Sequence, residues 1–261
     1  PSSSGFTTYM DNIGEIENKG FELNFRANVI RQDNLFVALF ANLAHNRNKI
    51  LKISESLKAY NDSIDQHFKE DRDENQPFLK YVEGGSLTSI FGMRSLGIDP
   101  ATGDEILLKR NGEQTKTWSS SEQTVLGNTE PDAQGTFGIN VTWKNWSLYA
   151  TFMYEFGGDA YNQTLVDKVE NANIYTMNVD KRILTERWQK PGDVKKYRKL
   201  ALRENKGSFS IPTTRPTERF VQKNNNLSLN SITLGYSLQA DSHRWLKTSG
   251  ISMLRFEIGA N

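Results

Sequence analysis

Six segments of the chain alternate apolar and polar residues with a period of two, and this alternation constrains the fold more than any other feature. A period of two is typical of a β-strand that has one apolar and one polar face. In the first segment Phe21, Leu23 and Phe25 face one way, while Glu22 and Asn24 face the other. The pattern predicts strands near residues 18–31, 35–46, 136–144, 146–157, 227–238 and 251–261.

The connections between these strands are of two very different lengths. Within each of three successive pairs the connection is short, about four, about two and roughly a dozen residues, as the turn composition indicates. Between the pairs lie long loops, 47–135 and 158–226, where about 4–6 residues is usual. A compact sandwich has a turn every 8–12 residues or so, whereas outer-membrane barrels combine short periplasmic turns with long extracellular loops. We therefore predict an all-β fold, an antiparallel transmembrane β-barrel whose long extracellular loops carry short helices.

Aromatic residues mark both ends of one predicted hairpin. Trp143 and Trp146 flank its tight turn, and Tyr154 and Phe156 lie about one strand length away. Membrane barrels place aromatic girdles at both interfaces in this way. Alternation by itself also fits a soluble antiparallel protein that packs the apolar faces into its own core, and this alternative stays open.

The composition removes several classes of protein. Lys and Arg total 32 and Asp and Glu total 31, a net charge of +1, so the chain lacks the basic excess of a nucleic-acid binder. The absence of cysteine excludes a disulfide scaffold and a thiolate zinc site. The longest uncharged apolar run, 35–44, is too short for a spanning helix of about 20 residues but matches a barrel strand of about 9–11.

The long loops carry weaker signals of local structure. In the second loop, a helix-like apolar stripe lies within 162–188 and consists of Leu165, Val169, Ala172, Val179 and Ile183. A second helical piece is predicted to begin at Asp180 and to end before Pro191 and Gly192. In the first loop, the Asp-Pro and Thr-Gly pairs within 98–104 predict a turn followed by a short strand. The charged run 69–74 predicts a solvated tip.

No arrangement of reactive side chains indicates an enzyme. The histidines lie far apart in the sequence, so no metal site is expected among His45, His67 and His243. Asp99 and Asp104 lack the order of a calcium loop and indicate a turn. The glycine pairs at 84–85 and 157–158 match no phosphate-binding motif and are also interpreted as turns. We expect no catalytic residue, cofactor or metal, and a secreted hydrolase would need an acidic pair that the sequence does not display.

Aromatic side chains in the loops are the candidate substrate contacts. An aromatic face beside planar polar groups suits a sugar ring or a peptide. The candidates lie among Asn, Gln, Asp and Arg residues: Tyr81, Trp118, Tyr161, Tyr175 and Trp188. For each of them, the alternative of holding one loop against another is equally open.

Six motifs occur in the order found in one family of transporters. They are NIGEIENKGFE at 12–22, GIDPATG at 97–103, LGNTEP at 126–131, FGGDAYN at 156–162, RWQKPGD at 187–193 and ITLGY at 232–236. Together they resemble the SusC-like (SusC/RagA) TonB-dependent transporters of the outer membrane. Segment 132–136 differs from the family, which usually has an aromatic residue and paired glycines at this place. The resemblance therefore does not predict the local structure of this loop.

The resemblance implies a fold, an activity and partners. The fold would be a plugged barrel of about 22 strands, of which residues 1–261 form a C-terminal fragment. The activity would be import of glycans or peptides across the outer membrane of Bacteroidota-type bacteria, with the loops extracellular. The partners would be a SusD-like surface lipoprotein, outer-membrane lipid, and the TonB complex through an N-terminal region absent here. The alternative function is a soluble β-rich carbohydrate-binding or adhesion module. Both ends of the sequence look cut, so we expect an interior piece of a longer protein.

Overall fold

The computed structural model describes residues 14–71, 73–172, 174, 178–200, 203–205, 208–210 and 213–261. The chain divides into two compact units. The first, here called the loop unit, comprises Pro1–Asn18, Asn48–Glu130 and Asp159–Lys223. The second, the sheet unit, comprises Lys19–Arg47, Pro131–Gly158 and Asn224–Asn261.

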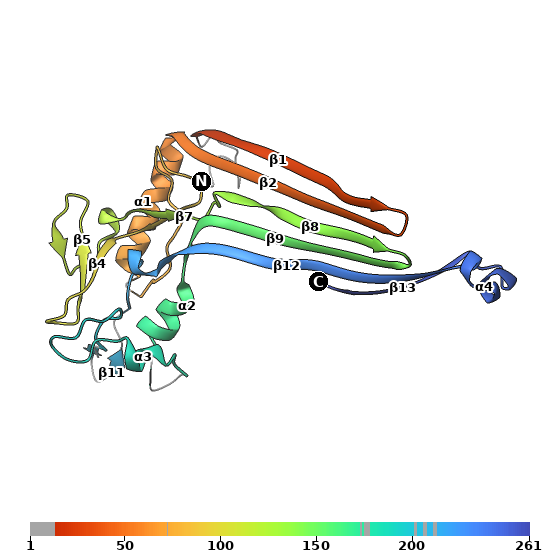
Figure 1. The fold of residues 1–261 in the computed structure, drawn as a ribbon. Helices are drawn as coiled ribbons and strands as arrows, with labels where there is room; N and C mark the ends of the chain where they lie inside the picture. Colours follow the sequence, from red (N-terminus) through yellow and green to blue (C-terminus); the bar gives the residue numbers. More distant parts are fainter. Residues whose placement is uncertain are drawn as a thin grey trace, which may run out of the picture. The chain divides into compact units, whose positions relative to one another are not determined.

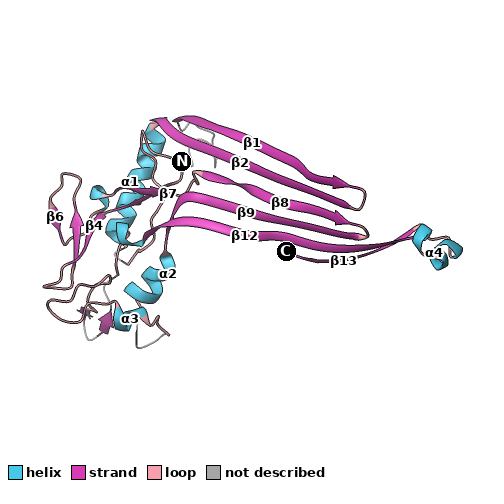
Figure 2. Ribbon diagram, in the orientation of Figure 1, coloured by secondary structure: helices cyan, strands magenta, loops and turns pink. Residues whose placement is uncertain are grey.

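Six long strands form one sheet in the order β1-β2-β8-β9-β12-β13 (Figures 1 and 2). The pairs β2–β8, β8–β9 and β12–β13 are antiparallel. The predicted antiparallel all-β architecture is confirmed. The strands are β1 (Gly14–Gln32), β2 (Leu35–Ile53), β8 (Ala133–Trp143), β9 (Trp146–Tyr161), β12 (Val221–Gln239) and β13 (Met253–Ala260).

Several strands are longer than the alternation predicts, at the ends away from the short connections. β2 continues to Ile53 rather than stopping near 46, and β12 begins at Val221 rather than near 227. The extensions are mainly polar, and a strand needs only paired backbone groups, not an apolar face, to continue. The glycine pair 157–158, interpreted above as a turn, lies inside β9, where Gly157 has a φ of 90°. That interpretation is wrong, because a single residue with positive φ can bend a strand without ending it.

The short connections join the strands in pairs. Residues 33–34 link β1 to β2, and residues 144–145 link β8 to β9, with Lys144 at a φ of 52°. The connection from β12 to β13 carries a 3-10 turn, η4 (Ala240–Ser242), and a short helix, α4 (Arg244–Thr248).

Strand register decides which residues share a face. Leu39 pairs with Ile139, and Ile139 pairs with Ala150, so these three side chains lie on one face of the sheet. Ala38 pairs with Asn140 on the opposite face. The sequence left the faces of 35–46 ambiguous, since both sets of alternate residues there are apolar.

The apolar face of the sheet is exposed. Phe21 is 53 % exposed, Phe25 61 % and Phe256 57 %. These rings are therefore not gathered in a dry interior, as they would be if the sheet packed its apolar face into a core. Folded soluble proteins seldom leave such contiguous apolar surface uncovered.

The loop unit holds short elements that the alternation did not predict. Its small sheets are β3 (Ser89–Gly92) with β7 (Thr124–Asn128), β4 (Arg94–Ile98) with β5 (Glu105–Leu108) and β6 (Gln114–Thr115), and β10 (Arg203–Asn205) with β11 (Ser208–Ser210). Its helical elements are α1 (Glu55–Glu70), η1 (Ser120–Glu122), α2 (Gln163–Leu165), η2 (Val166–Glu170), α3 (Arg182–Thr185) and η3 (Glu218–Phe220). Among the described residues, none of the helices has the length and apolar character needed to cross a membrane.

Helix α1 begins at a Ser54 cap, whose hydroxyl accepts the backbone N–H of Leu57 at 3.2 Å. It buries only Ile64 and Phe68 fully, one turn apart, which is too sparse a stripe to detect in the sequence. The charged run 69–74 starts in its last turn, and Lys69 is exposed as predicted.

The predicted stripe of 162–188 packs into a core, and the second helical piece expected from Asp180 is present as α3. Among the described residues of this segment, η2 ends at Glu170, α3 begins at Arg182, and Val179 is exposed. Four of the five stripe residues enter the core of the loop unit, which consists of Leu165, Val166, Val169, Ala172, Ile183, Tyr197 and Phe220.

Candidate functional site

A buried cluster of charges lies at the centre of the loop unit. The guanidinium of Arg219 donates from Nε and Nη2 to the two carboxylate oxygens of Glu105, each at 2.7 Å. Nη2 also donates to Oε1 of Glu170 at 2.7 Å. Glu170 is fully buried, and the side chains of Arg219 and Glu105 are nearly so. One arginine thus joins β5, η2 and η3, which are far apart in the sequence.

Two further arginines support the same cluster. Arg198 lies with Nε 3.5 Å from Glu170 Oε1. Arg187 donates to the backbone carbonyls of Val169, Glu170 and Arg198. These bonds satisfy carbonyl groups at the end of η2 that helical hydrogen bonds leave open.

The charges of the cluster are set by their mutual contact. Burial raises the pKa of Glu105, but the charge and hydrogen bonds of Arg219 outweigh it and hold that pKa below its usual range. Burial lowers the pKa of Arg219, and the two glutamates outweigh it, so that pKa lies above its usual range. Glu105 and Arg219 therefore stay ionised at neutral pH, and their ion pair holds the surrounding elements together.

The predicted turn around Asp99 is confirmed, and a lysine lies within it. Asp99 accepts the backbone N–H of Ala101 at 2.9 Å and the hydroxyl of Thr102 at 2.8 Å. Lys116 Nζ lies 3.0 Å from Asp99 and 3.4 Å from Asp104. The Thr102 hydrogen bond, the Ala101 hydrogen bond and Lys116 together lower the pKa of Asp99 to about 2. The carboxylate oxygens of Asp99 and Asp104 converge on the ammonium group of Lys116.

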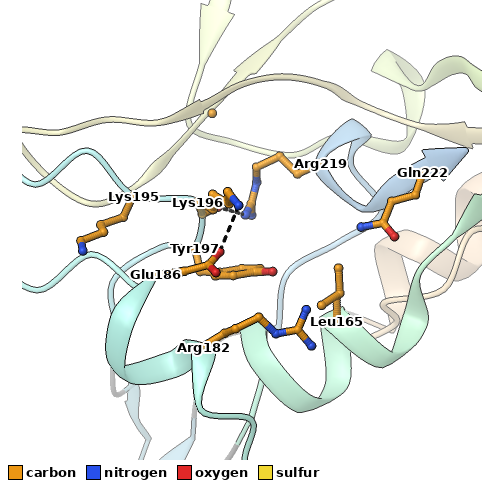
Figure 3. A pocket seen from close by; sticks show the side chains of 9 residues that line it. Leu165, Arg182, Glu186, Lys195, Lys196, Tyr197, Arg219 and Gln222 are labelled. Carbon is orange, nitrogen blue, oxygen red and sulfur yellow. Dashed lines mark hydrogen bonds and ion pairs between the residues drawn. The ribbon is translucent and has the colours of Figure 1, made fainter.

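One cavity of about 560 Å³ borders the charge cluster (Figure 3). The ring of Tyr197 lines this cavity together with the charged side chains of Glu186, Lys196 and Arg219. Lys196 pairs with Glu186 at 3.3 Å, as the dashed line in Figure 3 marks. Arg182 pairs with Asp180 at 2.7 Å.

Two adjoining cavities lie around Trp118, with volumes of about 570 and 460 Å³. They share Thr117, Trp118, Thr213 and Arg215. We call the larger one the Trp118 cavity; its lining includes Phe68, Lys69, Trp118, Ser119, Thr213 and Arg215.

The other aromatic candidates pack against separate partners. Tyr81 packs on Tyr60 at 5.9 Å between ring centroids. Trp188 donates from Nε1 to the carbonyl of Pro100 at 2.9 Å. Tyr161 packs edge-on against Phe220, and burial, with the charge of Glu105, raises its pKa. These three hold loop segments together, which is the alternative kept open for each of them, while Tyr175 lies outside the described residues.

His67 is less isolated than its sequence position indicates. Its Nε2 lies 3.6 Å from Glu74 Oε2, and Asp71 completes a group whose ligand atoms lie within 4.8 Å of one another. Asp71 and Glu74 accept backbone N–H groups of the following residues. Exposed groups of this kind are common without an ion, so we base no metal site on it.

The charge cluster escaped the sequence analysis for a simple reason. Glu105, Glu170 and Arg219 are separated by 65 and 49 residues, and no fixed spacing connects them. The RWQKPGD motif contains Arg187, which lies beside the charge cluster. The hydrogen-bond partners of Arg187 are backbone carbonyls, and a pattern of side chains in the sequence does not reveal them.

Curated proteins of similar sequence are TonB-dependent receptors of Formosa agariphila. Receptor P3 is 25 % identical over 99 % of this chain and 25 % of its own length. Receptor P39 is 24 % identical over 93 % of this chain and 26 % of its own. No family model matches the chain. The chain is similar in sequence to these TonB-dependent receptors.

The SusC-like resemblance stated from the six motifs is thereby confirmed. Among solved structures, the RagAB peptide importer in its open-open state matches with a TM-score of 0.70, 21 % identity, and coverage of 100 % of this chain and 27 % of that chain. The structure of the RagAB peptide transporter matches with a TM-score of 0.66 and 21 % identity, covering 93 % of this chain and 25 % of that chain. These matches show that the fold is shared.

The chain spans about a quarter of the length of the curated receptors that it matches. The curated relatives are named as receptors, which agrees with the expectation that this protein is not an enzyme.

Proposed function

We propose that this chain is a C-terminal portion of the barrel of an outer-membrane transporter that imports glycans or peptides. Residues 1–261 supply barrel strands together with the two long extracellular loops, 47–135 and 158–226. The names of the curated relatives support dependence on TonB, which would act through an N-terminal region of the full-length protein.

The observation that carries the proposal is the exposed apolar face of the sheet. It includes residues of neighbouring strands, since Leu39 of β2 and Phe137 of β8 lie on one face and are each 39 % exposed. Lipid tails cover such a face without cost, while water does not. The same exposure counts against the soluble carbohydrate-binding or adhesion module, which would need to bury these side chains.

The height of the apolar band supports the same conclusion. Trp146 and Phe156 lie on one face of β9, and both are exposed. Ten residues at about 3.4 Å each span about 34 Å along a strand. A strand tilted by about 40° then crosses about 26 Å, close to the apolar band of about 25 Å in outer-membrane barrels.

The edges of the sheet support a larger barrel. Within the six-stranded sheet, β1 and β13 each have one neighbouring strand. Unpaired backbone groups in lipid cost several kcal/mol each. Further strands of the full-length protein would pair with these edges and remove that cost.

A SusD-like surface lipoprotein is the proposed partner. The support is the fold shared with RagAB, a peptide importer by its title, together with the resemblance of the six motifs to the SusC-like family. Whether glycans or peptides are the cargo is tested by growth: a strain without the parent gene should fail to grow on one of the two as sole source and grow normally on the other. Growth on both would contradict the proposal.

Membrane location is tested on the full-length parent. The protein should sediment with outer membranes, dissolve only in detergent, and be cleaved in its long loops by protease added to intact cells. Recovery in the aqueous fraction without detergent would favour the soluble module instead.

A further inference from the structure

The sheet carries a groove near the turn that joins β8 to β9. Its volume is about 260 Å³, and its lining consists of Val141, Trp143, Trp146, Ser147, Leu148 and Leu234. Trp143 pairs with Trp146, and Val141 pairs with Leu148, so these side chains share the apolar face of the sheet. Apart from Ser147 and the indole N–H groups the lining is apolar, which suits a hydrocarbon chain.

A cation lies at the turn end of this groove. Lys144 follows Trp143 in the turn, and its Nζ lies 5.7 Å from the centroid of the Trp143 ring. The ring attracts the ammonium group through its face but accepts none of its N–H groups in the way a carboxylate would. Among the described residues, no carboxylate pairs with Lys144. Its donors therefore remain available to an anionic group beside the apolar groove.

The two tryptophans of the groove differ from those that pack inside the loop unit. Trp118 and Trp188 each donate the indole N–H to a backbone carbonyl. Trp143 and Trp146 are 52 % and 44 % exposed, and within the described part of the chain neither indole N–H has an acceptor. The Trp146 ring packs on Tyr236 at 4.7 Å between centroids, which fixes one wall. An apolar ring with an available N–H suits the boundary between acyl chains and headgroups.

We propose that this groove is a binding site for one phospholipid molecule. An acyl chain lies against Trp146 and Leu234, and the phosphate group accepts hydrogen bonds from Lys144 and from the Trp143 indole. The inference rests on the membrane location proposed above and goes beyond it, because it assigns a defined lipid to defined residues. The single positive charge of Lys144 favours a phospholipid with a net negative charge over a zwitterionic one.

Native mass spectrometry of the full-length parent, purified in mild detergent, tests the site. Three probes are added separately: phosphatidylglycerol, phosphatidylcholine, and glycerophosphoglycerol, which is the anionic headgroup without acyl chains. The fraction of the parent that carries one phosphatidylglycerol should exceed the fraction with phosphatidylcholine about fivefold. Glycerophosphoglycerol should not bind above background, because the apolar groove then has no occupant. The third probe thereby separates a phospholipid from a free phosphate compound.

A charge variant tests the role of the lysine. Lys144→Gln should lower the bound fraction of phosphatidylglycerol about fivefold, to the level of phosphatidylcholine. Lys247→Gln is the matched control, because Lys247 is exposed on α4 in the neighbouring connection and does not line the groove. The control should bind phosphatidylglycerol as the wild type does.

A second variant fills the groove and leaves the charge unchanged. Val141→Phe adds a ring inside the groove and should lower the bound fraction of both phospholipids. Leu23→Phe is its control, because it enlarges an exposed apolar side chain of β1 outside the groove. This pair keeps the proposal testable if Lys144→Gln disturbs the turn.

Four results would overturn the inference: equal binding of the two phospholipids, binding of glycerophosphoglycerol at the level of phosphatidylglycerol, binding unchanged by both Lys144→Gln and Val141→Phe, or an equal loss in the two control variants. In each case a parent that fractionates with the outer membrane keeps the transport proposal intact. A parent recovered in water that still binds phosphatidylglycerol in this groove would end the transport proposal and leave the lipid site standing.

Discussion

The sheet unit and the loop unit treat apolar and charged side chains in opposite ways. In the sheet unit, large rings such as Phe25 and Phe256 are more than half exposed. In the loop unit, Phe220 and Val169 are fully buried, and the carboxylate of Glu170 is buried with them. Large apolar side chains are therefore exposed in the sheet unit and buried in the loop unit of the same chain.

The contrast follows from the solvent that each unit would meet under the proposed function. A sheet surrounded by lipid gains nothing by hiding apolar side chains, and its backbone groups are satisfied by neighbouring strands. A unit in water needs an apolar core, and any charge inside that core needs a partner. Substitutions that change the buried charges of the loop unit, or the exposed apolar face of the sheet unit, can test this difference between the two units.

The largest expected effect is removal of the central cation of the loop unit. Arg219→Ala leaves Glu105 and Glu170 buried without their strongest partner, and we expect a loss of about 3–5 kcal/mol. Hydrogen exchange of the full-length protein should show faster exchange in the peptides of η2 and η3, with the sheet peptides unchanged.

Lys58→Ala is the control, since it removes the exposed Lys58–Glu55 pair on α1 and should leave exchange unchanged. Equal disturbance of both units by Arg219→Ala would contradict the division into two independently stabilised parts.

The next largest effect is expected on the apolar face of the sheet. Leu39→Arg places a charge near the middle of the apolar band and should destabilise the barrel by about 2–4 kcal/mol. Thr142→Arg, on the opposite face of the neighbouring strand, is the matched control and should be tolerated. Denaturant titration of the protein in lipid vesicles measures both. A smaller loss for Leu39→Arg than for Thr142→Arg would mean that the two faces are exchanged.

A smaller loss of stability is expected for a substitution in the GIDPATG turn, where Gly103 has both an unusual backbone conformation and a closely packed neighbour. Gly103 and Gly112 both have positive φ, 70° and 88°, a conformation that costs a side chain roughly 1–2 kcal/mol. A Cβ at Gly103 would also lie 2.5 Å from the Trp188 ring, while a Cβ at Gly112 meets nothing within 4 Å. Gly103→Ala should therefore increase protease cleavage of the loop unit more than Gly112→Ala does.

The smallest effect is confined to acid pH. The pKa of Asp99 is lowered to about 2 by hydrogen bonds from Thr102 and Ala101 and by Lys116. A depressed pKa stabilises the folded turn above the unfolded value of about 3.9, and that stabilisation is lost as pH falls through about 2. Cleavage by pepsin at residues 97–104 should rise between pH 4 and pH 2 in the wild type. In Asp99→Asn it should be high already at pH 4, and a wild-type-like profile in that variant would rule out Asp99 as the titrating group.

The sheet was predictable because alternation is a local property. Each predicted strand overlaps an observed one, since a face exposed to a single environment repeats every second residue. The errors lie where the repeat stops being apolar: the polar ends of β2 and β12 and the glycine pair inside β9. There the backbone remains paired although the side-chain signal has ended.

The candidate site was predictable only in part. Loop aromatics identified Trp118, which lines two cavities, but also Trp188 and Tyr81, which hold loop segments together. In the sequence these residues look alike, since each is an aromatic among polar neighbours. Their difference arises from contacts with residues far along the chain, such as Arg215 for Trp118.

The sequence alone determined that this chain forms hairpins with one apolar face, with tight connections on one side and long ones on the other. It also determined the SusC-like relationship, through motifs that keep their order. Only the tertiary structure decided which face each residue of β2 occupies, and that Arg219 joins Glu105 and Glu170. The reason is physical: alternation records the environment of each residue locally, while register and buried ion pairs depend on which distant segments meet.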